Sequence, residues 1–214
     1  MKRKIHGLFL ILAGLATLPA CATPLTYSAK EIRGQIVDAE TNQPIEGAIV
    51  VAQWVLFHIG PGGHKSRLHI HETVTGKNGH YVIPEWGPKV RPPMTELHNR
   101  DPEILIFKSG YEPMAVSNAL VSTVRPDSLR VSEWDGRVIK LKRVSNQENL
   151  EQYASRLNSF YDGLVEDMRN DYEWKKYPQM TIAVYKEYQL LKAKGLRIYR
   201  PSIPYVEEFA EPVR

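Results

Sequence analysis

The hydrophobic pattern changes its period once along the chain, and this change constrains the fold more than any other feature of the sequence. From about residue 30 to residue 144, short runs of β-branched and apolar residues are separated by Gly, Pro and Asn, and several runs alternate apolar with polar residues. This pattern is typical of an all-β sandwich. From residue 145 onward, apolar residues recur every three or four positions, which indicates helices. We therefore predict a mainly β protein: an antiparallel β-sandwich of the immunoglobulin or transthyretin type with a C-terminal α-helical extension.

Six segments are predicted to be strands, and one tight turn is clear among them. Asn78-Gly79 is a favoured pair for a two-residue hairpin turn, because both central positions of such a turn need a positive φ. Two inserts rich in Gly and Pro, residues 59–66 and 87–101, are expected to be exposed loops. The strands are expected at residues 32–38, 48–55, 68–75, 81–83, 103–108 and 137–142.

The helical part is expected to span residues 145–195 and to hold two helices. Ser145 and Glu148 form a capping box, in which each side chain accepts from a backbone amide of the first turn. Pro178 begins the second helix, and Gly195 is placed to end it. The apolar stripe of the first helix either packs on the sandwich or docks a partner, and the first interpretation is favoured because short amphipathic helices usually face their own core. The stripe comprises Leu150, Tyr153, Ala154, Leu157, Phe160, Tyr161, Leu164 and Met168.

The N-terminus has the layout of a secretory signal. Lys2, Arg3 and Lys4 precede an apolar run of 12 residues, Gly7 to Leu18. A helix of that length covers only about 18 Å, which is short of the roughly 30 Å core of a bilayer. A permanent transmembrane helix is therefore not expected.

The only cysteine of the chain follows this run directly, in Leu18-Pro19-Ala20-Cys21. These four residues resemble the lipobox of bacterial lipoproteins. The resemblance implies that residues 1–20 are removed, that Cys21 carries a three-chain lipid anchor, and that residues 21–29 form a tether. Because Ala22 is not the aspartate that retains lipoproteins in the inner membrane, it also implies the periplasmic side of the outer membrane in a Gram-negative host. The alternative is an ordinary signal peptide that leaves Cys21 as a free thiol.

The net charge of +4 and the isoelectric point near 9.0 are largely properties of the signal. Without residues 1–20, the chain keeps 25 Lys and Arg against 24 Asp and Glu. A nearly neutral chain lacks the basic excess that nucleic-acid binding requires, so nucleic acid is excluded as a partner.

Several motifs in the predicted sandwich resemble the carboxypeptidase regulatory-like domain, a member of the transthyretin-like group of β-sandwiches. The match rests on residues 34–38 and 44–50, on Thr75 with residues 78–83, on residues 107–113 and on residues 138–141. Gly76 departs from the family pattern, which commonly has an acidic residue there. The resemblance implies a sandwich over residues 30–144 that is non-catalytic and serves as a folding, spacing or adhesive module.

No motif of a known catalytic class is present. The sequence has no Gly-x-Ser-x-Gly, no His-Glu-x-x-His and no phosphate-binding glycine loop, and its last residues, 196–214, are expected to form an extended tail without the Tyr-Arg-Gly-Ser that ends hydroxyisourate hydrolases. We therefore expect a binding or structural module of the cell envelope, with an envelope protein or cell-wall glycan as partner. An unrecognised hydrolase is the least favoured alternative.

A cluster of histidines supplies the second alternative, an exported metal-binding protein. Five of the seven histidines lie between positions 58 and 80, and His69 and His71 are two apart on a predicted strand. With Leu68, Ile70 and Val74 facing inward, both imidazoles are expected on the outer face, where His64 and Glu72 could complete a zinc or copper site. The simpler interpretation, an outward face that merely needs polar residues, is favoured, and no cofactor is expected.

Overall fold

The computed structural model describes residues 24–59, 65–98, 100–119, 128–144, 150–164 and 173–196. The predicted signal, Cys21, the first residues of the tether, His64, the capping box and the tail from residue 197 onward lie outside the described residues. Within the described part, no helix is long and apolar enough to cross a membrane.

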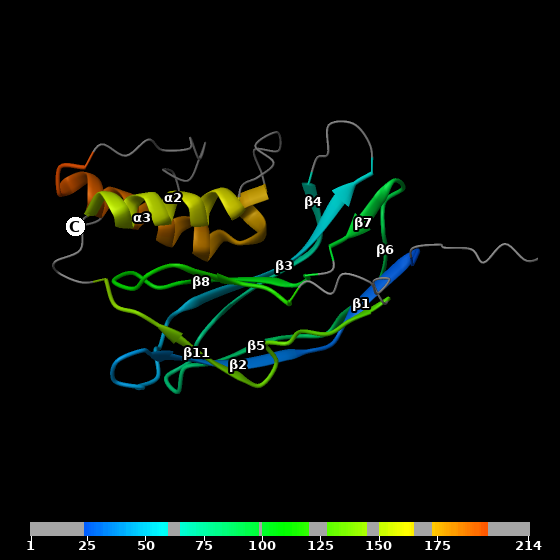
Figure 1. The fold of residues 1–214 in the computed structure, drawn as a ribbon, viewed down its shortest axis with the longest axis horizontal. Coiled ribbons are helices and arrows are strands. Elements are labelled where there is room, and N and C mark those ends of the chain that lie inside the picture. Colours follow the sequence, from blue (N-terminus) through cyan, green and yellow to red (C-terminus); the bar gives the residue numbers. More distant parts are fainter. Residues whose placement is uncertain are drawn as a thin grey trace, which may run out of the picture.

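The molecule is built of three layers (Figure 1). The middle layer is a five-stranded sheet in the order β4-β3-β8-β9, with β7 also paired to β3. Helices α2 (Leu150–Leu164) and α3 (Pro178–Ala193), joined to the short helix η2 (Glu173–Lys176), cover one face of this sheet. The strands of the middle sheet are β3 (Ile49–His58), β4 (Lys65–Val74), β7 (Thr95–Leu97), β8 (Glu103–Phe107) and β9 (Met114–Val116).

Two three-stranded sheets cover the other face of the middle sheet. One has the order β11-β2-β5 and the other β10-β1-β6, and two of their pairings, β11 with β2 and β1 with β10, are parallel. Their strands are β1 (Thr26–Ala29), β2 (Ile32–Asp38), β5 (His80–Ile83), β6 (Trp86–Val90), β10 (Leu129–Arg130) and β11 (Arg137–Leu141). The fold is thus the predicted mainly β sandwich with a C-terminal helical extension, although its strand pairing is not wholly antiparallel.

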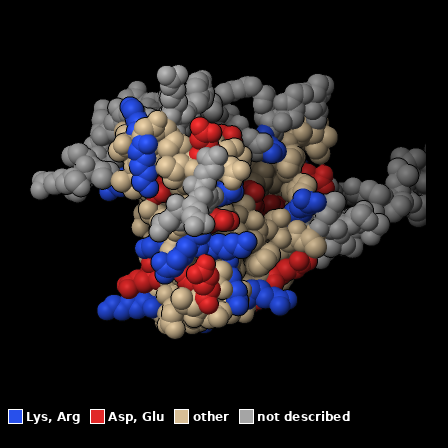
Figure 2. Space-filling model, turned by 60° about the vertical axis from the view of Figure 1, so that its left-hand side comes forward, with Lys and Arg blue, Asp and Glu red and all other residues tan. Residues whose placement is uncertain are grey.

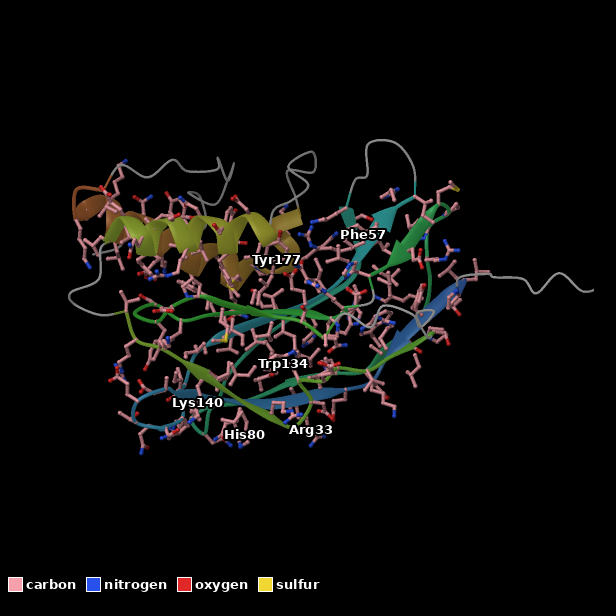
Figure 3. The ribbon with its side chains drawn as sticks, in the orientation of Figure 1. Arg33, Phe57, His80, Trp134, Lys140 and Tyr177 are labelled. Atoms are coloured by element: carbon pink, nitrogen blue, oxygen red, sulfur yellow. The ribbon has the colours of Figure 1, made fainter. Side chains whose placement is uncertain are left out.

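The core between the sheets is aromatic and aliphatic. Trp54 of β3 is fully buried there beside Trp86, with the two rings 5.1 Å apart in an edge-to-face arrangement. Trp134 also packs against this core, and Figure 3 shows it between the sheets, whereas Arg33, His80 and Lys140 lie on the outer face, away from the helices. Burial of these apolar side chains supplies the main stabilisation of the sandwich.

A second core lies between the middle sheet and the helices. Val51, Leu105 and Phe107 point from the sheet into the apolar stripe of α2 and the inner face of α3. Tyr177, just before α3, is buried in this layer (Figure 3). The prediction that the stripe packs on its own sandwich is confirmed for residues 150–164, and Met168 lies outside the described residues.

A turn does lie at residues 76–79, but the predicted two-residue hairpin is wrong: Asn78 does not have a positive φ, and β4 and β5, which flank the turn, belong to different sheets. The central residues of the turn are Lys77 and Asn78, and Gly79 follows them. Gly79 has φ +73°, and a Cβ at this position would collide with the carbonyl oxygen of Ile36. Its amide donates to the carbonyl of Gly76 at 2.8 Å. Only glycine combines this backbone conformation with so close an approach.

Two expectations about irregular segments are corrected. Thr26–Ala29, within the predicted tether, is strand β1, and Tyr27 and Ala29 are buried in the sandwich core. Strands β6 and β7 occupy much of residues 87–101, where an exposed loop was expected. Both errors have one cause: these strands are only three to five residues long, and their stability comes from pairing with distant segments rather than from local pattern.

Candidate binding site

A polar cavity of about 430 Å³ lies where β3, β4 and β8 approach the C-terminal end of α2. Its volume is in the range of small-molecule sites. Phe57, near the top of β3 in Figure 3, forms part of the wall. The ionisable side chains around the cavity are both basic and acidic: Lys65, Arg100, Asp101, Glu103 and Asp162.

A hydrogen-bonded chain of side chains holds the wall of the cavity to the helical layer. Arg67 of β4 donates from Nε to Gln53 Oε1 at 2.6 Å, and Gln53 Nε2 donates to Glu103 Oε2 at 2.6 Å. Arg67 Nη2 also donates to the carbonyl of Leu164 at 2.6 Å. The last carbonyls of a helix lack partners within the helix and carry the negative end of its dipole, so a guanidinium is a suitable cap.

Asp101 is the most unusual group of the cavity. It is only 3% exposed; its Oδ1 accepts from the Val55 amide at 3.2 Å, and its Oδ2 has no hydrogen-bond partner. Burial raises the pKa of this carboxyl to about 8, although the nearby Arg130 guanidinium acts in the opposite direction. At neutral pH the carboxyl is therefore mostly protonated, and it can donate a hydrogen bond as well as accept one.

The cavity also contains a serine and a histidine, Ser117 and His98, but not as a catalytic pair. Among the described residues no hydrogen bond joins these two side chains, and His98 Nδ1 instead accepts from the Arg100 amide at 3.3 Å. Burial, followed by the repulsion of Arg100, lowers the pKa of His98. Nucleophilic catalysis by serine needs a base within hydrogen-bond reach, and His98 is not placed as that base for Ser117.

The predicted orientation of the histidine strand is wrong. His71 is paired with Ala52 and His69 with Trp54, both of which belong to the core between the sheets. The register shifts at Trp54 and Val55, leaving Leu68 as the extra residue of a bulge. The imidazoles therefore lie on the inner face of β4, and it is Ile70 that faces the helices.

His69 is held firmly on this inner face. Its ring centroid lies 5.5 Å from that of Trp54 and 4.9 Å from that of Trp86. Its Nδ1 lies 2.8 Å from Lys89 Nζ, so the lysine donates and the imidazole accepts. Burial lowers the pKa of His69 to about 4, and repulsion from Lys89 and His71 acts in the same direction. The imidazole is neutral, and one of its nitrogens is already engaged.

Glu72 faces the opposite way and has a different role. Its carboxylate accepts from the amides of Gln179 at 3.0 Å and Met180 at 2.7 Å, in the first turn of α3. A carboxylate at the N-terminus of a helix accepts hydrogen bonds from the free amides of the first turn. Its negative charge also interacts favourably with the positive end of the helix dipole. Glu72 thus joins β4 to the start of α3, which begins at Pro178 as predicted.

The four candidate metal ligands are therefore not brought together. Glu72 is on the other face of β4 from His69 and His71, and His64 lies outside the described residues. Among the residues with described positions, no group of three or more His, Cys, Asp and Glu side chains could hold a metal ion.

We expect calorimetric titration of zinc or copper into the mature protein to show no binding tighter than about the millimolar range, because two imidazoles alone, one of them hydrogen-bonded to a lysine, make a weak site. Binding in the micromolar range that disappears in His71→Ala would contradict this expectation and restore the metal hypothesis.

The cavity residues carry no signal that sequence reasoning could have used. Asp101 precedes a proline in a segment expected to be an exposed loop, where an aspartate is ordinary. Its burial arises because β3, β8 and the loop after β9 meet around it. Arg67 and Glu103 are each followed by an apolar residue, Leu68 and Ile104, as solvent-facing strand residues often are.

Comparisons with known proteins give limited similarity. No family model and no curated protein matches the chain. Among solved structures, a streptococcal ancillary pilin is 13% identical with a TM-score of 0.27, and the match covers 55% of this chain and 30% of the pilin chain. A catechol 1,2 dioxygenase variant from Acinetobacter radioresistens is 15% identical with a TM-score of 0.32, covering 58% of this chain and 54% of its own.

A third similar structure is the pilus 2b backbone protein of group B streptococcus, which is 15% identical with a TM-score of 0.28, covering 55% of this chain and 42% of its own. The chain thus matches less than two thirds of the length of each of these three proteins. Its class is defined by its own strands and helices: a mainly β sandwich with a helical layer over one sheet.

Proposed function

We propose that this chain is an exported, lipid-anchored protein of the cell envelope, whose β-sandwich and helical layer form a non-catalytic binding module. The observation that carries the binding role is the polar cavity beside α2, whose wall is fixed by the Arg67 and Gln53 hydrogen bonds and which offers charges of both signs. Its serine and histidine are not joined as a catalytic pair. The anchor is supported by the signal-like N-terminus and by Cys21 in its lipobox-like context.

The partner proposed for the cavity is an envelope component, either a protein or cell-wall glycan. Tagged lipidated protein is to be purified from its host envelope as wild type, as Arg100→Ala at the cavity, and as Lys140→Ala on the outer face of β11 as the matched control (Figure 3). Wild type and Lys140→Ala are expected to retain the same envelope component, and Arg100→Ala to retain less of it. Protein that retains no envelope component and yet turns over a substrate would overturn the proposal.

The anchor makes a separate prediction. When residues 1–21 are replaced by a signal peptide that an ordinary signal peptidase cleaves, export continues but no cysteine is present to receive lipid. The exported chain is then expected to move from the membrane fraction to the soluble periplasmic fraction, because a multi-chain anchor is otherwise effectively permanent. Unchanged membrane association at high salt would contradict the anchor.

A further inference from the structure

Four exposed apolar side chains gather at one end of the sandwich. They are Leu25 before β1, Ile59 after β3, Val90 at the end of β6 and Met94 before β7, and each is between 52% and 68% exposed. In Figure 1, β1, β6, β7 and the end of β3 meet at the right-hand end of the molecule. We call these four residues the apolar end.

Backbone contacts hold the apolar end together. Thr26 pairs with Val90, and the Arg91 amide donates to the carbonyl of Leu25 at 3.0 Å. On the other side, the Ile59 amide donates to the carbonyl of Met94 at 2.8 Å. The four residues therefore come from three separate segments that are tied to one another rather than from one isolated loop.

Met94 is presented by an unusual backbone conformation. Its φ of +57° lies in the left-handed region, which costs a residue with a Cβ of the order of 1 kcal/mol and persists only where the surroundings impose it. Here, Thr95 Oγ1 donates to the Pro92 carbonyl at 2.7 Å, and the Arg91 guanidinium donates to the Thr95 carbonyl. The turn is thus fixed with a large apolar side chain exposed at its tip.

The position of Cys21 indicates that the apolar end faces the membrane. Leu25 is four residues after Cys21, and four residues span at most about 14 Å even when fully extended. A lipid on Cys21 therefore holds Leu25 close to the membrane surface. The left-hand end of the molecule, turned forward in Figure 2, instead carries interspersed Lys, Arg, Asp and Glu side chains.

We propose that the apolar end is a membrane-docking surface, and that Leu25, Ile59, Val90 and Met94 enter the headgroup region of the same bilayer that holds the Cys21 lipid. This inference rests on the proposed lipid anchor. Apolar side chains at a membrane interface add binding energy in proportion to the area they bury, so the anchor and the apolar end together fix the orientation of the module.

The test uses the lipidated protein and one introduced thiol. Lipidation blocks Cys21, the only native cysteine, so Val90→Cys can be labelled with an environment-sensitive fluorophore. Val138→Cys is the matched control, because Val138 is also an exposed strand valine (53%, against 66% for Val90), on β11. Both proteins are reconstituted into vesicles of phosphatidylethanolamine and phosphatidylglycerol that contain nitroxide-labelled lipid, and the mass of each N-terminal peptide is measured first.

The label at position 90 is expected to shift to the blue and to be quenched by the nitroxide about fivefold more strongly than the label at position 138. The double substitution Leu25→Ser and Met94→Ser alters only exposed side chains. In that background, the difference in quenching between positions 90 and 138 is expected to fall by at least about half. Equal quenching at both positions of a lipidated protein would overturn the docking surface alone. An N-terminal peptide without lipid would instead overturn the anchor.

Discussion

Replacing Leu157 with alanine is expected to lower the free energy of unfolding by about 2–5 kcal/mol. Leu157 is fully buried in the core that α2 and α3 form with Val51 and Leu105 of the middle sheet. Truncating it removes apolar contacts and leaves a cavity between the helices and the sheet. Chemical denaturation followed by circular dichroism and by tryptophan fluorescence measures this change.

The matched control is Leu190→Ala on α3, because Leu190 is 40% exposed. Its effect is expected to be below about 0.5 kcal/mol. Both probes should report one transition at the same midpoint, since the helices share a core with the sandwich. If Leu157→Ala melted the helical signal alone and left the fluorescence midpoint unchanged, the helical layer would be an independent unit, contrary to the packing described.

Replacing Asp101 with asparagine is expected to stabilise the protein, and to do so more strongly as the pH rises. The pKa of the Asp101 carboxyl is about 8 in the folded chain and about 4 in an unfolded one. Between these values the folded chain binds one more proton than the unfolded chain, so the contribution of Asp101 to the free energy of unfolding falls as the pH rises. Asparagine removes this dependence and can still accept from the Val55 amide.

Asp101→Asn is therefore expected to exceed wild type by on the order of 5 kcal/mol at pH 8 and to match it near pH 4. Thermal unfolding at several pH values measures the difference. The control Glu46→Gln, at an exposed turn, is expected to differ from wild type by less than about 0.5 kcal/mol at every pH. The contrary result is a stability difference, variant minus wild type, that is smaller at pH 8 than at pH 4. It would show that the folded chain accommodates the Asp101 charge.

The sequence predicts those parts of the fold that are marked by local pattern. Strands such as β2 and β11, the presence of a turn before β5 and both helices follow from alternation, turn residues and helical spacing. The pairing of β5 with β2 rather than with β4 does not. Strands β1, β6 and β7 could not be found in this way, because pairing with β3 and with one another determines them. The alternation also shows that His69 and His71 share a face, but only the bulge at Leu68 and the helices covering the other side determine which face it is.

The candidate site depends almost wholly on contacts between distant segments. Asp101 is buried because β3, β8 and the loop after β9 meet around it, and Arg67 acquires its role only when the end of α2 reaches β4. Local sequence cannot carry this information, since an aspartate before a proline and an arginine on a strand are both ordinary surface residues. The proposed lipid anchor is the opposite case: it rests on local sequence alone.

The central claim, a lipid-anchored envelope module, is tested most directly by the mass of the N-terminal peptide of the protein purified from the membrane of its host. The account predicts a peptide that begins at Cys21 and carries a thioether-linked diacylglyceryl group, with residues 1–20 removed. A peptide with a free thiol at Cys21, or a mature N-terminus at another residue, would contradict it.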